Sequence, residues 1–519
     1  MSRDYTPCVD PATGRQIGRS PLHTPGEAAA IVARARRAQP AWAELSPRRR
    51  ARRLAALRDY LVDSADELAE VICRDNGKTR VDALATEVLP AVLALSYYLK
   101  MAPRWLRPRR LRPASLLLAN KAGRLHRLPY GVVGIVSPWN YPFAIPFSEV
   151  VMALLAGNAV VLKVATQTQM VGRRLEEVFL AAGLPEGVFN YLNLPGPEAG
   201  RALLAGGVDK LFFTGSVAVG RRLMALAAEH LTPVCLELGG NDPMLVCPDA
   251  DLVRAAGGAV WAGLSNCGQS CGGVERIYVH RSVYRPFLEL LRRRVESLRV
   301  GPDRDFAVDL GAMTTRSQMQ TVRRHLEDAL ERGAVVYAQS PVPQGGGNFL
   351  PAVVLTEVNH DMLVMREETF GPVLAVMAVE SMDQAVELAN DCHLALTASV
   401  WSRDRRAARR LALRLQAGVL TINDHLMSHG LAETPWGGRK DSGIGRTHGE
   451  LGFAEMTQPV CLVDERLPRL KRNLWWHPYD RQVYQGLRGM LDMRYASGWR
   501  RRWLGMQQLL KALPRVLRP

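Results

Sequence analysis

Two residues in glycine-rich stretches carry side chains suited to covalent catalysis. Cys271 lies in NCGQSCGG, and Glu237, thirty-four residues earlier, lies in LELGGN. A cysteine flanked by small residues can attack an electrophile as its thiolate, and a carboxylate can activate the water that later releases the intermediate. The pair therefore indicates a nucleophile and a general base.

Two polar motifs follow apolar runs. Asn140 ends SPWN after the run GVVGIV, and its amide offers two hydrogens that suit a developing oxyanion. Gly215 and Ser216 follow KLFFT and precede a helix-like segment, where backbone amides can meet a phosphate. Taken alone, the asparagine is more typical of a helix cap, and the Gly-Ser pair of a turn and cap.

Length and composition predict a folded, multidomain protein. A chain of 519 residues should form roughly two to four compact units, and 47% hydrophobic with 23% charged residues is ordinary for a globular protein. Eight scattered cysteines indicate reduced thiols in a cytoplasmic protein. The start MSRDYTPCVDPATG predicts neither a signal peptide nor an anchor, and no uninterrupted apolar run approaches the ~20 residues that span a bilayer.

The net charge of +17 is concentrated at the end of the chain. Residues 466–519 hold thirteen Lys and Arg against two Asp, so this segment alone contributes +11. The rest is only mildly basic, which argues against a general nucleic-acid surface.

The order of the predicted elements indicates an α/β fold. Residues 26–99 have apolar positions at helical spacing, and short apolar runs begin after the basic stretch RWLRPRRLRP (104–113). Helix-like segments such as 171–182 and 220–230 alternate with these runs, which predicts parallel sheets with crossover helices. The strand candidates are SLLLA, GVVGIV, AVVLKV, KLFFTG, PMLV, 275–279, 335–338, 373–379 and 398–401.

Several motifs in register resemble the aldehyde dehydrogenase superfamily over residues 11–464. They are PATG, PWN, FTGSxxxG, LELGG, GQxC, EETFGP and PWGGRKDSGIGR. The resemblance implies a Rossmann-like NAD(P)-binding domain (1–110 and 129–238), a second α/β catalytic domain (239–440) and a small β hairpin for homo-oligomer formation (111–128 and 441–464). It leaves residues 465–519 as a basic, amphipathic extension.

The resemblance also implies roles for individual residues. Cys271, with a lowered thiol pKa, would attack the aldehyde, Asn140 would stabilise the oxyanion, and Glu237 would activate water to hydrolyse the thioester that follows hydride loss. No metal takes part, and Cys267 and Cys235 are interpreted as packing residues. Cofactor-binding positions are Ser137, Pro138, Trp139, Lys163, Thr166, Gly215, Ser216, Gly220, Leu238, Gly239, Glu368 and Phe370.

Two departures from the family pattern bear on function. Thr166 stands where relatives often carry a glutamate that repels a 2′-phosphate, so NADP is expected to be accepted, alongside NAD. The extension holds Trp475, Trp476, Trp499 and Trp503 among arginines, a pattern that suits an interfacial helix on an anionic membrane. The alternatives are packing of these aromatics on the enzyme or a partner subunit and, less favoured, nucleic-acid binding.

The leading hypothesis is NAD(P)-dependent oxidation of an aldehyde to a carboxylic acid. A dehydrogenase that acylates coenzyme A is the alternative within enzymes, and Glu237 argues against it. A catalytically idle, membrane-associated scaffold is the alternative outside them. The protein is expected to be cytoplasmic or peripheral on the membrane, as a homodimer or homotetramer; the sequence does not identify the aldehyde.

Overall fold

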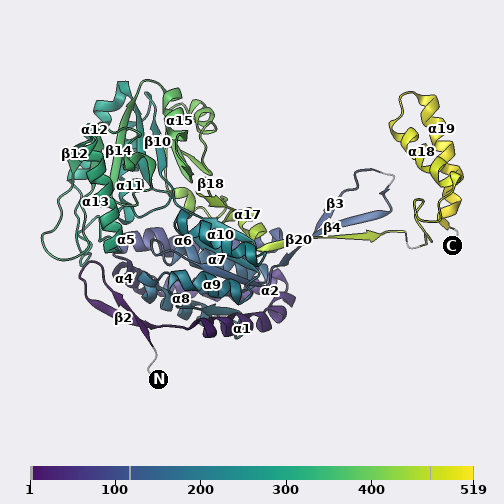
Figure 1. Cartoon of the computed structure of the whole chain (residues 1–519), viewed down its shortest axis with the longest axis horizontal. Coiled ribbons are helices and arrows are strands. Elements are labelled where there is room, and N and C mark those ends of the chain that lie inside the picture. The colour runs from purple at the N-terminus through teal and green to yellow at the C-terminus, as the bar shows by residue number, and fades with distance from the viewer. Residues whose placement is uncertain (1–3, 116–117, 468, 518–519) are drawn as a thin grey trace. The chain divides into compact units, whose positions relative to one another are not determined.

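A computed structural model describes residues 4–115, 118–467 and 469–517. It divides into two units, one of residues 1–106 and 128–458 and the other of residues 107–127 and 459–519 (Figure 1). The first unit opens with an antiparallel hairpin, β1 (Tyr5–Val9) and β2 (Gln16–Pro21). The helical opening predicted from the sequence follows as α1 (Pro25–Glu44), α2 (Pro47–Leu54), α3 (Ala56–Asp63), α4 (Ala65–Asn76), α5 (Arg80–Ala83), the π-helix Leu84–Val88 and α6 (Leu89–Trp105).

A six-stranded sheet forms the middle of the first unit. Its strands are parallel except for β19, which pairs antiparallel with β9. Helices pack on both of its faces: α1, α9 (Gly196–Ala205) and α10 (Val217–Glu229) on one, and α2, α6, α7 (Ala144–Ala156) and α8 (Gln169–Ala181) on the other. The strand order is β19 (Gly443–Ile444), β9 (Val234–Glu237), β8 (Lys210–Thr214), β5 (Val132–Val136), β6 (Ala159–Lys163) and β7 (Phe189–Tyr191).

A seven-stranded sheet follows along the chain, and only its β12–β13 pair is antiparallel. It is packed with α11 (Leu252–Leu264), α12 (Arg281–Glu296), α13 (Arg316–Glu331), α15 (Met382–Asn390) and α16 (Arg405–Ala412). The strand order is β12 (Val335–Gln339), β13 (Val353–Thr356), β14 (Val373–Val379), β11 (Val274–His280), β10 (Asp242–Val246), β16 (Thr397–Trp401) and β17 (Val419–Ile422). The predicted α/β class with parallel sheets is therefore confirmed.

Two predicted segments differ from the structure. The candidate strand SLLLA lies partly outside the described residues, at 116–117, and residues 118–120 are not a strand. The strands here are β3 (Arg109–Leu111) and β4 (Lys121–Pro129). The segment 441–464, predicted to act in oligomer formation, is divided: Gly443 and Ile444 pair with β9 and α17 (Gly449–Glu455) packs in the first unit, whereas β20 (Thr457–Glu465) joins β4 and β3.

The extension forms a helical hairpin in the second unit. Its helices, α18 (Arg481–Tyr495) and α19 (Trp499–Ala512), lie side by side (Figure 1). Their backbones approach closely at two glycines, since a Cβ on Gly489 would lie 2.4 Å from the carbonyl oxygen of Gly505. A small apolar cluster that includes Leu474 and Leu509 completes the hairpin.

The stretch Arg80–Trp105 is, among the described residues, the one helical segment long and apolar enough to span a bilayer by length and composition. Leu95, Tyr98 and Ala102 of this stretch are buried in the core against α7. These contacts are those of a core helix, and its exposed side chains include Leu89 and Leu93.

A buried arginine closes the carboxyl end of α7. The Arg50 guanidinium donates to the carbonyl oxygens of Leu155 (2.9 Å), Ala156 (3.4 Å) and Ala43 (3.1 Å), and 4% of the residue is exposed. Carbonyls at a helix end have no partner within the helix, so this side chain replaces water there.

We expect Arg50→Ala to lower the free energy of unfolding by about 3 kcal/mol, because several buried carbonyl oxygens would lose their donors. Urea unfolding followed by tryptophan fluorescence measures the change. Arg48→Ala, on the exposed side of α2, is the matched control and should change stability by less than ~0.5 kcal/mol. Equal stabilities for the two variants would contradict the role assigned to Arg50.

Candidate active site

Cys271 follows an irregular loop that leads into β11. Asn266 and Cys267 in this loop both adopt left-handed backbone conformations, with φ of 52° and 54°. The Asp82 carboxylate accepts a hydrogen bond from the Asn266 amide (3.1 Å), and the Gln269 side chain donates to the Asn266 carbonyl (3.0 Å). Conformations of this kind persist only where surrounding contacts hold them, so the loop fixes where the Cys271 side chain begins.

The electrostatic surroundings of Cys271 are acidic. Its side chain is partly exposed, yet burial in the protein raises the pKa of the thiol, and the carboxylates of Glu368, Asp242 and Glu237 raise it further. The prediction of a lowered thiol pKa is therefore wrong for the protein by itself. The main physical reason is that burial disfavours the charged thiolate, and the groups around the sulfur are carboxylates rather than cations.

Glu237 ends strand β9 and points into a buried space. Its two carboxyl oxygens have no hydrogen-bond partner among the described residues, and 5% of the residue is exposed. Burial raises the pKa of Glu237 well above its usual range, Glu149 raises it further, and Arg446 opposes the shift. A buried, unpartnered carboxyl group of this kind can accept a proton from a water molecule at its surface.

Asn140 is held by contacts on both its side chain and its backbone. Its amide donates to the Gln269 carbonyl oxygen at 3.1 Å, and its own carbonyl accepts from Lys78 Nζ and Asn266 Nδ2, each at 2.9 Å. The side chain therefore lies beside the Cys271 loop. The alternative that Asn140 caps a helix is wrong, because α7 begins at Ala144 without a side-chain cap from it.

Two charged residues that the motifs did not predict organise the Asn140 segment. Lys78 and Glu87 form an ion pair of 2.6 Å in which both side chains are fully buried. The second Glu87 oxygen accepts from the amides of Phe143 (2.7 Å) and Ala144 (3.1 Å) at the start of α7. The only signal of this role in the sequence was a single glutamate in the otherwise uncharged stretch 83–99.

Glu368 and Phe370 lie on a loop fixed by another unpredicted acid. Glu275, in β11, accepts from the amides of Thr369 and Phe370, both at 2.8 Å. Phe370 has φ of 51°, and its ring meets the Trp139 ring edge-on at 5.4 Å. Glu368 accepts from the Gly240 amide at 3.0 Å, and a Cβ on Gly239 would lie 2.3 Å from its carboxylate, so a larger residue at 239 would displace the Glu368 side chain.

A cavity of about 200 Å³ brings most of the predicted residues together. Ser137, Lys163, Thr166 and Gly220 are not among its lining residues, and Gly220 packs against Leu238 instead. Lys163 is buried, which lowers its pKa to about 8, and Thr166 is partly exposed. The predicted residues that line the cavity are Cys271, Glu237, Asn140, Pro138, Trp139, Gly215, Ser216, Leu238, Gly239, Glu368 and Phe370.

These residues fit a dinucleotide cofactor at this cavity. Ser216 lies just before α10 and makes no side-chain cap, so the amides at this helix start are open to a phosphate. Ser137 Oγ is buried and has no hydrogen-bond partner among the described residues. The Trp139–Phe370 ring pair and the Glu368 carboxylate, which line the same cavity, suit a nicotinamide and its ribose.

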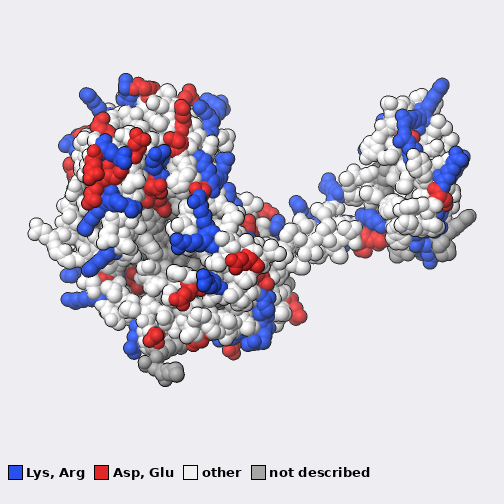
Figure 2. Space-filling model, viewed as in Figure 1, with Lys and Arg blue, Asp and Glu red and all other residues white. Residues whose placement is uncertain are grey.

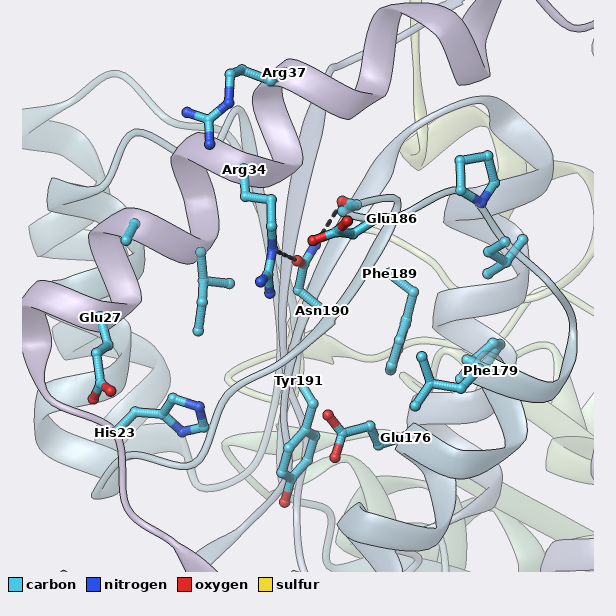
Figure 3. A pocket seen from close by; sticks show the side chains of 16 residues that line it. His23, Glu27, Arg34, Arg37, Glu176, Phe179, Glu186, Phe189, Asn190 and Tyr191 are labelled. Carbon is cyan, nitrogen blue, oxygen red and sulfur yellow. Dashed lines mark hydrogen bonds between the residues drawn. The ribbon is translucent and has the colours of Figure 1, made fainter. Parts of the chain in front are cut away.

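A separate cavity of about 600 Å³ contains none of the catalytic candidates. Figure 3 shows Arg34 and Arg37 of α1 on one side of it and Glu176 of α8 on the other. Arg34 donates to Asn190 at 2.9 Å, so this space lies at the β7 edge of the six-stranded sheet. Cavity size alone does not identify the reactive site of this protein.

The remaining cysteines near the motifs are core residues. Cys267 is buried in the core around the seven-stranded sheet, and Cys235 in the core around the other, as predicted. Within the described part of the chain, no group of three or more His, Cys, Asp or Glu side chains is arranged to hold a metal ion.

Comparisons with known proteins agree with this geometry. The family model for the aldehyde dehydrogenase family matches residues 1–461. A 4,4'-diapolycopene aldehyde oxidase from Methylomonas sp is 41% identical over 489 residues, 94% of this chain and 91% of the relative. A match over 489 residues must end at position 489 or later, so it includes part of α18 in the extension.

Two further comparisons bear on the cofactor. A putative succinate-semialdehyde dehydrogenase [NADP(+)] from Mycolicibacterium smegmatis is 37% identical over 471 residues, 90% of each chain. The NAD+ complex of an aldehyde dehydrogenase from Bacillus cereus superposes with a TM-score of 0.85 at 31% identity, covering 89% of this chain and 93% of that one. The chain therefore belongs to the aldehyde dehydrogenase family and is an oxidoreductase that acts on an aldehyde group with NAD or NADP.

Proposed function

We propose that the protein oxidises its aldehyde to a carboxylic acid through a covalent intermediate on Cys271. The observation that carries this proposal is a cavity that Cys271 shares with Glu237, Asn140 and Glu368. A nucleophile, a carboxyl group without partners and an amide donor around one space are the groups that acyl transfer to water requires.

The proposed order of action is attack, hydride loss and hydrolysis. The Cys271 thiolate adds to the carbonyl carbon, and the Asn140 amide and the Cys271 backbone amide stabilise the oxyanion of the thiohemiacetal. A bound cofactor would supply a positively charged nicotinamide as the hydride acceptor, and loss of the hydride would convert the thiohemiacetal on Cys271 into a thioester. Glu237 takes a proton from water, and the resulting hydroxide displaces the thiolate and releases the acid.

The cofactor assignments extend this proposal. Glu368 and Phe370 would bind the nicotinamide ribose and its ring, and Lys163 and Thr166 the adenosine ribose. Ser137, Pro138, Trp139, Gly215, Ser216, Gly220, Leu238 and Gly239 would form the rest of the cofactor site. A hydroxyl at Thr166 can donate to a 2′-phosphate, so we propose that NADP is accepted as well as NAD.

Hydrolysis is favoured over transfer of the acyl group to coenzyme A. Both Glu237 oxygens are without partners among the described residues and so are free to bind water. The same feature argues against an idle scaffold, because burying a carboxyl group without partners destabilises the fold and brings no structural benefit.

Glu237→Gln should separate the two half-reactions. We expect one equivalent of reduced cofactor per active site in a rapid burst, followed by turnover at least ~100-fold slower than in the natural protein, because the thioester is no longer hydrolysed. Absorbance of the reduced cofactor measures both phases with a panel of aldehydes. Cys271→Ala is the control and should give no burst.

The same assay tests the alternatives. Restoration of steady turnover in Glu237→Gln by coenzyme A would support the acylating enzyme. No reduced cofactor from the natural protein with any aldehyde and either cofactor would overturn the proposed reaction.

The pKa of Cys271 gives a pH prediction. Since the pKa lies above neutral pH, the reactive thiolate is a minor species whose fraction increases about tenfold per pH unit. Alkylation of Cys271 by iodoacetamide in the protein alone should therefore accelerate about tenfold per unit from pH 6 to 8, as measured by mass spectrometry of the Cys271 peptide. A rate that levels off within this range would contradict a raised pKa.

We propose further that the α18–α19 hairpin binds an anionic membrane surface. Trp499 (74% exposed), Trp503 and Tyr484 project from it, whereas Trp475 packs in its small apolar cluster. Arg500, Arg501 and Arg502 stand between Trp499 and Trp503 in the sequence, and Figure 2 shows Lys and Arg side chains on the visible face of this part of the chain. Interleaved aromatic and basic side chains match the interfacial region of a bilayer with anionic headgroups. The location would then be cytoplasmic and peripheral on the membrane.

Deletion of residues 465–519 should abolish sedimentation with vesicles containing about one third anionic lipid, while aldehyde oxidation continues in solution. Trp499→Ser with Trp503→Ser should weaken binding in the full chain, and raised salt should do the same because the charge contribution is screened. Unchanged vesicle binding after deletion would contradict the proposal. A smaller oligomer after deletion would favour packing on a partner subunit instead.

Strand β20 is proposed as the element that joins subunits. It lies at the edge of the sheet it forms with β4 and β3, and its side chains from Gln458 to Asp464 are exposed. An exposed edge strand offers unpaired backbone groups to another chain. A homodimer and a homotetramer both fit this arrangement.

A further inference from the structure

A second cavity reaches Cys271 and shares only this residue with the cofactor-side cavity. Its walls come from the α5–α6 region, the start of α7, α11 and the segment 426–436. It is narrow, about 80 Å³, and Tyr141, Ile145 and Trp436 are among its lining residues. We call this space the substrate channel.

The substrate channel carries no formal charge. Its described lining contains no Lys, Arg, Asp or Glu. Burial lowers the pKa of His429 to about 4 and raises the pKa of Tyr141, so both side chains are neutral near pH 7. A substrate that carries a carboxylate would lose its hydration here without gaining a cation, which is strongly unfavourable. An uncharged lining is therefore a poor environment for a short semialdehyde that ends in a carboxylate.

The outer part of the channel continues onto the surface as an apolar rim. Leu89, Leu93, Trp261 and Met427 line the channel, and each is about 41% to 51% exposed. They come from the apolar stretch Arg80–Trp105, from α11 and from the 3-10 helix Met427–Gly430 after β17. Contiguous exposed apolar side chains around an opening mark a place where an apolar ligand binds.

We propose that the substrate is an aldehyde with an elongated, uncharged hydrocarbon chain. Its carbonyl carbon lies at Cys271, its chain occupies the substrate channel, and its distal end covers the rim formed by Leu89, Leu93, Trp261 and Met427. This inference rests on the proposed role of Cys271 and adds the substrate class. A narrow, uncharged channel with an apolar rim gains binding energy from each methylene that leaves water.

A series of straight-chain aldehydes tests the chain-length dependence. From butanal to dodecanal, kcat/KM should increase about fourfold per methylene until the rim is covered and then level off. A twelve-carbon aldehyde that carries a carboxylate at its other end should lose most of this increase in kcat/KM. A flat series, or preference for a four-carbon semialdehyde with a carboxylate, would overturn the proposal.

A charge placed on the rim tests the binding site. Leu93→Arg should lower the ratio of kcat/KM for dodecanal to that for butanal at least tenfold, and should increase the relative use of the carboxylated long aldehyde. Leu330→Arg, at an exposed leucine of α13 outside the channel, is the matched control. It should change neither the ratio of kcat/KM for dodecanal to that for butanal nor the relative use of the carboxylated long aldehyde. Equal effects of the two substitutions would contradict a rim at Leu93.

Protection of Cys271 separates failure of this inference from failure of the proposed reaction. Dodecanol, which cannot form a thiohemiacetal, should slow alkylation of Cys271 by iodoacetamide, whereas butanol at the same concentration should not. Protection without any aldehyde oxidation would overturn the reaction and support the channel. Oxidation of aldehydes without protection or chain-length preference would overturn the channel and support the reaction.

Discussion

The buried ion pair of Lys78 and Glu87 fixes the backbone on which the active site depends. Lys78 donates a hydrogen bond to the carbonyl of Asn140, and Glu87 accepts from the amides of Phe143 and Ala144 at the start of α7. One ion pair therefore fixes the positions of both the proposed oxyanion donor and the start of this helix. Removing one partner of such a pair typically costs about 3–5 kcal/mol, because the other charge is left buried and alone. The position of Asn140 is thus determined by groups that never contact the substrate.

The reactive groups lie where strands of the two sheets end or begin. Glu237 ends β9 of one sheet, whereas Cys271 precedes β11 of the other. Glu275, from β11 itself, holds the loop of Glu368 and Phe370 over the same cavity. Burial raises the pKa of the thiol, and the carboxyl groups that this arrangement concentrates around it raise it further, so a cationic nicotinamide would be a favourable neighbour for the thiolate.

Local patterns in the sequence predicted many of the strands that make up the two sheets. Short apolar runs predicted β5, β6, β8 and β10, because a strand buried on both faces has few polar positions. The run SLLLA has the same composition, yet residues 118–120 are not a strand, and the nearby strand β4 has partly exposed side chains. Apolar composition therefore does not predict a strand such as β4, which lies outside the core and is only partly buried.

The sequence by itself determined the α/β class, the family and the identities of the candidate catalytic residues, because each is carried by residue type and local spacing. Only the tertiary structure decided the raised pKa of Cys271, the supporting roles of Lys78, Glu87 and Glu275, and the uncharged channel with its apolar rim. These properties depend on which distant side chains share a space and on how little water reaches them. Sequence order does not specify either until the sheets and helices have packed.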